Sequence, residues 1–334
     1  MSITICLQLG EISDMVSKDR ILNVTKQALS LGLDVTVYLR FLVLLLCFRY
    51  LWPGCDEDRK ISIANRFFYP RYEKAVFHDY KSYIERMPGD IRNIVADFPQ
   101  NRWLGDRKVL DLGCGLGRFT KLLKEQGASA VVGLEYQIDK LVFAQEHNIN
   151  ENIRYICGSA SLLPFKESTF DTVFAYAVFE HIDETQNALL EVARILKAGG
   201  VVVIAMDYLT SRGGHHLHPY VHFPWPLSIV SEESLYRYWS RRLARDQSKN
   251  MMSYYKRVNE ANGSEVDKEI CLNRITIEEF ERQIEKAGMM IELFIPGERI
   301  AQYFPFILRF RNLRKFFVGS PLYCLRNNKL MDQQ

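Results

Sequence analysis

The stretch Lys108-Val-Leu-Asp-Leu-Gly-Cys-Gly-Leu-Gly-Arg-Phe119 joins a short apolar strand to a helical segment through three glycines. Glycine suits this junction because it allows a tight turn and lets a ligand approach the backbone closely. The spacing is GxGxG, and Arg118 stands where the GxGxxG fingerprint of a dinucleotide site needs its last glycine. The motif therefore predicts a strand–loop–helix ligand site that fits an NAD pyrophosphate poorly.

From Arg107 to the C-terminus, short apolar runs alternate with stretches of helical periodicity. Gly199-Gly200 is expected to end the helix before the fifth strand. Such alternation is typical of parallel strand pairing with helices on both faces. We predict an α/β fold: a Rossmann-like, doubly wound, seven-stranded, mainly parallel sheet with an N-terminal helical extension and an insertion after the fifth strand. Strands are expected at 108–112, 130–136, 153–158, 170–176, 201–206, 289–295 and 322–325, and helices at 119–126, 138–147, 184–196, 276–287 and 300–317.

The domain organisation follows from where this alternation starts and lapses. Residues 1–57 form an apolar N-terminal extension, and residues 58–106 are expected to be a helical cap broken at Pro70 and at Pro88-Gly89. Residues 107–334 form one domain, in which 207–270 is an insertion on the substrate side.

The apolar stretch from Leu31 to Trp52 leaves three interpretations open. A membrane-spanning helix needs about 20 apolar residues, whereas Arg40 and Arg49 bracket a shorter core. These arginines are nine residues apart and would lie about 180° apart on a helix, which argues against a single basic face. The stretch is a helix packed on protein, a membrane attachment, or a poorly ordered leader.

Bulk composition excludes several classes of protein. The 334 residues carry a net charge of +3, which is too small to imply nucleic acid, so no nucleic-acid partner is expected. The seven cysteines include no CxxC pair, so neither a disulfide framework nor a zinc knuckle is indicated. A cytoplasmic location is the default, with membrane association as the alternative.

An acidic residue ends the expected second strand. Glu135 lies 18 residues after Gly117, where a carboxylate can accept hydrogen bonds from both hydroxyls of a ribose. Together with the glycine loop, it predicts a nucleoside-containing ligand at the carboxyl ends of the strands.

The sequence resembles the class I S-adenosylmethionine-dependent methyltransferases, and within them the branch of the ubiquinone- and menaquinone-biosynthesis enzymes. The resemblance rests on the segments 109–119, 133–136, 158–165, 170–182 and 194–204. Two positions depart from the family pattern: Ser159 replaces an aspartate of the adenine loop, and Ala198 replaces a proline. The resemblance implies S-adenosylmethionine as cofactor. The expected cofactor-binding residues are Asp111, Gly113, Gly115, Gly117, Glu135, Tyr136, Ser159, Ala160 and Tyr176.

Two polar residues follow the expected fourth strand. His181 is the best candidate for a general base because its ordinary pKa of about 6.5 suits neutral pH, and Glu180 is the second catalytic candidate. The alternative is that both residues orient a loop or cap the next helix.

A histidine cluster marks the insertion. His215, His216, His218 and His222 lie within eight residues, among prolines and Trp225. We interpret this segment as a substrate-covering loop in which His215, His216, His218 and Trp225 touch the acceptor. Metal binding and plain packing are the alternatives, and no metal site is assigned because such sites usually include carboxylates.

Two basic, aromatic stretches, at 236–257 and 302–330, suit a membrane surface, an anionic lipid-linked substrate, or the solvated side of an ordinary helix. The function we expect is methyl transfer to a small-molecule or lipid-like acceptor, at oxygen by analogy with the family. The alternatives are a methyltransferase acting on a lipid-linked glycan, a non-catalytic S-adenosylmethionine-binding protein and an NAD-dependent oxidoreductase, the last disfavoured by Arg118. The sequence does not indicate an oligomeric state.

Overall fold

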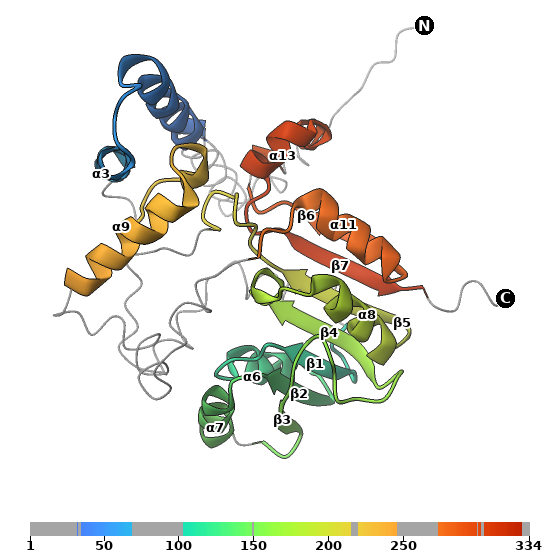
Figure 1. Cartoon of the computed structure of the whole chain (residues 1–334). Helices are drawn as coiled ribbons and strands as arrows, with labels where there is room; N and C mark the ends of the chain where they lie inside the picture. The colour runs from blue at the N-terminus through green and yellow to red at the C-terminus, as the bar shows by residue number, and fades with distance from the viewer. Residues whose placement is uncertain are drawn as a thin grey trace, which may run out of the picture.

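The fold is built on one sheet of seven strands (Figure 1). This computed structural model describes residue 32 and residues 35–68, 103–148, 150–214, 220–245, 273–298, 300–301 and 304–328. The strand order is β3-β2-β1-β4-β5-β7-β6; β1 to β5 are parallel, and β7 is antiparallel to both β5 and β6. The predicted mainly parallel, seven-stranded sheet is confirmed. The strands are β1 (Lys108–Leu112), β2 (Ala130–Glu135), β3 (Ile153–Cys157), β4 (Phe170–Tyr176), β5 (Leu196–Ala205), β6 (Met289–Ile295) and β7 (Leu322–Asn327).

Helices cover both faces of the sheet. On one face α8 (Thr185–Ile195) and α11 (Ile277–Lys286) bury Leu189, Phe280 and other apolar side chains against β4, β5 and β7. On the other face α6 (Arg118–Glu125) packs Leu123 in a cluster with residues of β1, β2 and β4. α7 (Ile138–His147) follows β2 and contacts β3. The doubly wound arrangement expected from the sequence is therefore present.

Two predicted helix boundaries are wrong. α8 ends at Ile195, and β5 begins at once with Leu196 and runs through Gly199-Gly200, so these glycines lie in a strand rather than stopping a helix. The pairing of β4 with β5 shifts register in this region, which accommodates the irregular start. The helix expected over 300–317 is broken because Pro305 begins a separate turn, η5 (Pro305–Arg309), before α13 (Arg311–Phe317).

A second apolar core lies at the N-terminal side of the molecule. Residues 35–46 are helical and continue as the π-helical turn η1 (Cys47–Leu51); we call residues 35–51 the N-terminal helix. It packs with α3 (Glu57–Phe68), η3 (Pro226–Ser228) and α9 (Glu232–Arg245), which together form the N-terminal lobe (Figure 1). One face of the N-terminal helix thus packs on protein, and this packing leaves the question of membrane attachment open. No helix in the described part of the chain has the length and hydropathy to cross a bilayer.

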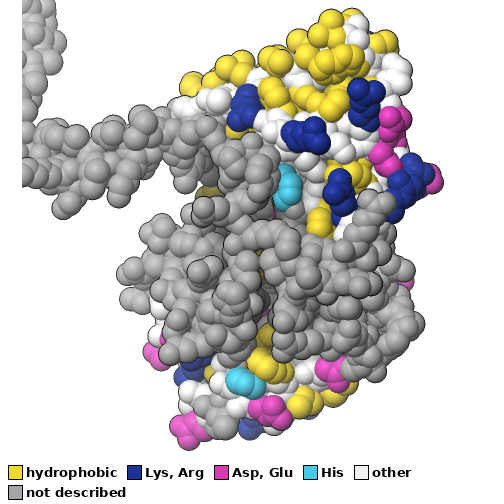
Figure 2. Space-filling view, turned by 90° about the vertical axis from the view of Figure 1, so that its left-hand side faces the viewer, with side chains coloured by type: hydrophobic (Ala, Val, Ile, Leu, Met, Phe, Trp, Pro, Cys, Tyr) yellow, Lys and Arg dark blue, Asp and Glu magenta, His cyan; other side chains and the backbone are white. Residues whose placement is uncertain are grey.

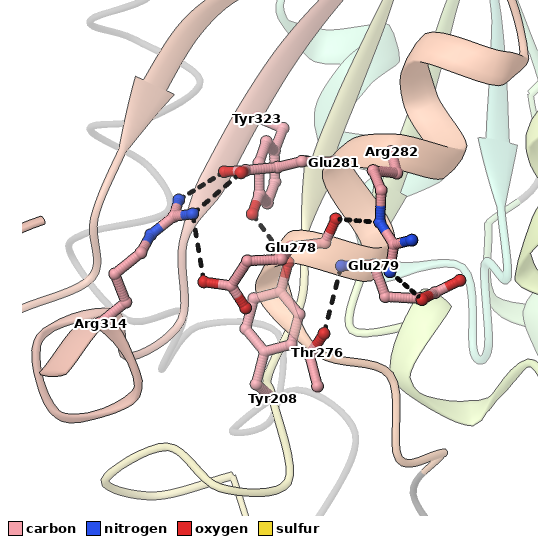
Figure 3. A network of polar contacts seen from close by, with 8 residues as sticks. All are labelled: Tyr208, Thr276, Glu278, Glu279, Glu281, Arg282, Arg314 and Tyr323. Atoms are coloured by element: carbon pink, nitrogen blue, oxygen red, sulfur yellow. Dashed lines mark hydrogen bonds and ion pairs between the residues drawn. The ribbon is translucent and has the colours of Figure 1, made fainter. Parts of the chain in front are cut away.

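Helix α13 connects the lobe to the sheet. On one side, Tyr38 of the N-terminal helix donates its hydroxyl to the carbonyl of Phe316 at 2.8 Å. On the other side, Arg314 donates two hydrogen bonds to Glu281 of α11, at 2.6 and 3.0 Å, with Glu278 next to them (Figure 3). Beside this pair the hydroxyls of Tyr208 and Tyr323 lie 2.7 Å apart and buried, which fixes the start of the insertion against β7.

Candidate functional site

The glycine loop follows β1 in the conformation that its sequence requires. Gly113, Gly115 and Gly117 have φ of +69°, +52° and +78°, values that disfavour residues with a Cβ. A Cβ on Gly113 would lie 2.4 Å from Val178, and one on Gly117 would lie 2.5 Å from the hydroxyl of Tyr155. The loop is held to the next strand because the amides of Gly113 and Cys114 both donate to the carbonyl of Leu134. Gly113 and Gly117 thus serve packing as well as the turn.

Gly115 differs from its neighbours because a Cβ there would meet no atom within 4 Å. Its amide donates to Oε2 of Glu135 at 3.1 Å, while Oε1 of Glu135 accepts from the amides of Tyr136 and Gln137 at 2.9 and 3.2 Å. The Glu135 carboxylate is therefore held beside Gly115, where the space next to the backbone is free of other described atoms. Oε1 already accepts two hydrogen bonds and Oε2 accepts one, so Oε2 can accept a further hydrogen bond. The Glu135 carboxylate beside Gly115 thus fits a hydroxyl of the adenosyl ligand that the sequence implies.

Asp111 lies near Glu135 and is 2% exposed. Burial raises the pKa of Asp111 to about 7; the hydroxyl of Thr120, which donates to its Oδ2 at 2.6 Å, acts in the opposite direction, and the nearby Glu135 raises it further. Two carboxylates at one edge of the sheet suit a cationic ligand, since a positive charge compensates what burial costs. Thr120 was missed by sequence reasoning because no motif relates it to Asp111.

Four other expected cofactor residues lie at the same edge. Tyr136 follows β2 and is 59% exposed. Ser159 and Ala160 follow β3; the hydroxyl of Ser159 accepts from the amide of Ser161 at 3.2 Å. Tyr176 ends β4, and its ring lies 4.7 Å from that of Phe119 at the start of α6. These positions lie at the carboxyl ends of β2, β3 and β4, the strands on the two sides of β1.

The two catalytic candidates have different surroundings. Both belong to the turn η2 (Phe179–His181) after β4. Glu180 is 1% exposed, its Oε1 accepts from the amide of Asp207 at 3.4 Å, and burial together with Asp207 raises its pKa to about 8. His181 is exposed to solvent. Glu180 is therefore buried, with a pKa that favours its protonated form near neutral pH, while the side chain of His181 is exposed.

The histidine-rich segment is described only in part. His215, His216 and His218 lie outside the described residues. Trp225 is 1% exposed and lies in the core of the N-terminal lobe, with its ring 4.7 Å from Tyr38 and 4.9 Å from Phe41. The expected contact of Trp225 with the acceptor is thus wrong for this structure, because packing buries the indole. Within the residues that the structure describes, no group of three His, Cys, Asp or Glu side chains could hold a metal ion.

Comparison with known proteins agrees with this geometry. Residues 110–204 match a family model described as a methyltransferase domain. A sterol 24-C-methyltransferase of Gibberella zeae is 30% identical over 98 residues, which span 28% of this chain and 26% of that enzyme. The chain therefore matches only about a quarter of the length of that relative.

Two further similarities extend over more of a chain. An uncharacterised protein of Methanocaldococcus jannaschii is 32% identical over 174 residues, covering 50% of this chain and 71% of that protein. A crystal structure of an S-adenosylmethionine-dependent methyltransferase from Mesorhizobium loti aligns with a TM-score of 0.47 and 16% identity, over 73% of this chain and 99% of the other.

Proposed function

We propose that this chain, whose residues 110–204 match a methyltransferase domain, is a class I S-adenosylmethionine-dependent methyltransferase that transfers a methyl group from that cofactor to a small-molecule or lipid-like acceptor. The observation that carries the proposal is the Glu135 carboxylate, which three backbone amides hold beside the open side of Gly115. The sheet edge around it carries further polar and aromatic groups for a nucleoside.

The proposed division of labour at this edge follows from the chemistry of each group. Glu135 accepts a hydrogen bond from a ribose hydroxyl at Oε2, and Gly115 leaves room for the sugar. Asp111 stabilises positive charge beneath the loop. The exposed ring of Tyr136 and the segment of Ser159 and Ala160 bound the adenine side, where the hydroxyl of Ser159 replaces the carboxylate that relatives carry. When bound, S-adenosylmethionine supplies a methyl group activated by the adjacent sulfonium charge.

The proposed contribution of the protein to rate is alignment together with one proton transfer. Holding two reacting groups in line contributes on the order of 7–11 kcal/mol in well-oriented reactions. We propose oxygen as the acceptor atom and His181 as the base that removes the hydroxyl proton, since its exposed imidazole follows β4. Glu180 supports this turn from the interior rather than contacting the acceptor.

The lipid-like class of acceptor is supported by the relatives. The Gibberella protein is named a sterol methyltransferase, and a squalene methyltransferase of Botryococcus braunii is 28% identical over 165 residues. The sterol enzyme is named for transfer to carbon, so the acceptor atom is the part of the proposal that most needs a direct test.

Cofactor binding is tested by titration calorimetry with S-adenosylmethionine, S-adenosylhomocysteine and NADH. We expect both adenosyl ligands to bind and NADH not to bind, because Arg118 replaces the glycine on which a dinucleotide would lie. Binding of NADH without binding of either adenosyl ligand would contradict the proposal.

Catalysis is tested with S-adenosylmethionine that carries a labelled methyl group, incubated with cell extract and separated into lipid, polysaccharide, RNA and small-molecule fractions. Label is expected in the lipid or small-molecule fraction, and carbon NMR of the product identifies a methyl ether. The His181→Gln variant should bind cofactor normally and transfer the methyl group at least roughly 100-fold more slowly. Cofactor binding without methyl transfer to any fraction would contradict the catalytic proposal and favour a non-catalytic S-adenosylmethionine-binding protein.

A further inference from the structure

The N-terminal helix has two apolar faces, and only one of them is packed. Phe41, Leu44 and Phe48 are 3–6% exposed and contribute to the core of the lobe. The opposite face is also apolar, although a helix on the surface of a soluble domain usually presents polar residues there. Its exposed side chains, 38–68% accessible, are Val35, Leu39, Leu42, Val43, Leu46, Tyr50, Leu51 and Trp52.

Arg40 is the residue that would interrupt this exposed face, and the structure turns it inward. Its guanidinium donates to the carbonyl of Phe67 and lies 4.8 Å and 5.3 Å from the rings of Phe67 and Phe68 in α3. The positions of Arg40 and Arg49 on opposite sides of the helix therefore do not argue against an apolar exposed face. Arg40 belongs to the packed side, and Arg49 remains exposed at the end of the apolar face.

A second exposed apolar segment lies next to the N-terminal helix. Phe304, Phe306, Phe310 and Leu313 of η5 and α13 are 43–57% exposed. The two segments are neighbours, since the rings of Tyr38 and Phe317 stack at 5.2 Å and those of Phe41 and Phe316 lie 6.4 Å apart. Exposed apolar side chains on two neighbouring elements indicate an interaction surface.

Positive charge accompanies this apolar surface. Arg49, Arg309, Arg311 and Lys315 are exposed. Arg66 and Arg242 line a cavity of about 340 Å³ between α3 and α9. Figure 2 shows hydrophobic side chains covering the top of the lobe and Lys and Arg side chains below them.

Two acidic residues of α3 have partners elsewhere in the lobe. Glu57 accepts hydrogen bonds from the amide and hydroxyl of Ser231, and Asp58 pairs with Arg241. No acidic residue occurs between Gln302 and Leu330. An exposed apolar face of leucine and aromatic side chains with basic residues near it is complementary to an anionic lipid bilayer, which has acyl chains beneath negative headgroups.

We propose that the N-terminal helix lies in the plane of an anionic phospholipid bilayer, with its exposed apolar face among the acyl chains and the neighbouring arginines and lysines at the headgroups. Tyr50 and Trp52 occupy the level of the interface, which amphipathic aromatic side chains prefer. The inference is independent of the proposed catalytic function, because none of these residues contributes to the cofactor edge.

Vesicle co-sedimentation of the full chain tests this docking. The protein should sediment with vesicles of phosphatidylcholine and phosphatidylglycerol and much less with phosphatidylcholine alone. The triple variant Leu39→Asn/Leu42→Asn/Leu46→Asn should bind roughly 100-fold more weakly, since each leucine loses apolar area that the acyl chains would cover. The double variant Leu162→Asn/Leu190→Asn is the matched control: both leucines are exposed but lie outside the lobe, and its binding should equal that of the wild type.

Charge is tested separately from apolar contact. The Arg49→Gln/Arg311→Gln variant should bind the anionic vesicles roughly 30-fold more weakly, because each basic residue near such a surface contributes about 1 kcal/mol. Raising the salt concentration should also weaken the binding of the wild type to anionic vesicles.

The intrinsic fluorescence gives a direct readout of the docked face. The chain has four tryptophans, and Trp52 is the exposed one: it is 48% accessible, whereas Trp103, Trp225 and Trp239 are 1–9% accessible. Anionic vesicles should shift the emission to shorter wavelength, and Trp52→Phe should remove the shift. The proposal is overturned if the wild type neither sediments nor shifts. It is also overturned if it forms a dimer that the triple leucine variant lacks, because the face would then join two copies.

Discussion

The cofactor edge of the sheet and the N-terminal lobe differ in charge and in the way they are assembled. The edge buries carboxylates, with Asp111 2% and Glu135 5% exposed, in a segment that is continuous in sequence. The lobe exposes arginines and apolar side chains, and its core joins segments that are far apart in the sequence, since Phe41 packs against Trp225. One chain thus combines a buried acidic edge, where we propose that a cationic cofactor binds, with a basic apolar surface, where we propose that an anionic bilayer binds. Local sequence encodes the first, and long-range packing produces the second.

The largest effect is expected where the lobe core is emptied. Trp225→Ala removes a side chain that is 1% exposed and packed against Tyr38, Phe41 and Phe316. Such a truncation costs about 3–5 kcal/mol of unfolding free energy, measurable by denaturant titration. If the lobe and the cofactor edge are separate units, the affinity for S-adenosylmethionine should be unchanged under native conditions. A parallel loss of affinity would show that the two regions are coupled, and Leu190→Ala, at an exposed leucine, serves as the control.

The next effect concerns the cofactor edge alone. Glu135→Ala removes the acceptor for the amides of Gly115, Tyr136 and Gln137, together with the proposed ribose ligand. Hydrogen bonds to a charged group contribute about 1.5–3 kcal/mol each, so calorimetry should show roughly 100-fold weaker binding of S-adenosylmethionine. Vesicle binding through the lobe should not change.

Glu285→Gln is the matched control for that variant, because Glu285 is an exposed carboxylate on α11 and far from β2 in sequence. Its affinity should equal that of the wild type. Unchanged affinity in Glu135→Ala would remove the residue from the proposed site.

A pH-dependent effect should distinguish the interior of the edge from its surface. The pKa of Glu180 is raised by burial from 4.5 to about 8, so between these values the folded protein holds a proton that the unfolded chain has lost. The unfolding free energy contributed by this group therefore falls as pH rises from 4.5 to 8 and is constant above that range. The difference in unfolding free energy between Glu180→Gln and the wild type should shift in favour of the variant over the same interval, by up to about 1.4 kcal/mol per pH unit. Thermal unfolding curves that stay parallel at all pH values would show that Glu180 is not buried as a carboxyl group.

The sequence predicted the cofactor edge because its determinants are local. The glycines at 113, 115 and 117 predict the positive φ angles that the structure shows, and Glu135 follows at the distance that one helix and one strand require. Strand alternation fixed the sheet for the same reason. The error at Gly199-Gly200 shows where this fails. Glycine was expected to end a helix, but α8 ends at Ile195 and β5 begins at Leu196, so the two glycines lie at an irregularity in the pairing of β5 with β4.

The sequence did not predict the side-chain partners that depend on distant parts of the chain. Thr120 acts on Asp111 because α6 folds back on β1, and no spacing rule relates the two. Trp225 was expected at the acceptor because of its neighbours in sequence, whereas Tyr38 and Phe41 bury it. The orientation of Arg40 toward α3 likewise depends on a contact that periodicity alone does not reveal.

The smallest predicted effect concerns the connection between the two regions. Arg314 of α13 makes a two-point contact with Glu281 of α11, with side chains 14% and 26% exposed (Figure 3). A double-mutant cycle with Arg314→Gln and Glu281→Gln should give a coupling free energy of about 1 kcal/mol or more, since partial burial limits screening. The matched cycle uses Arg282 and Glu279 on the same helix, where exposures of 64% and 42% and a spacing of three residues predict only about 0.2–0.5 kcal/mol. Equal coupling in the two cycles would mean that α13 is held to the sheet by apolar packing rather than by this ion pair.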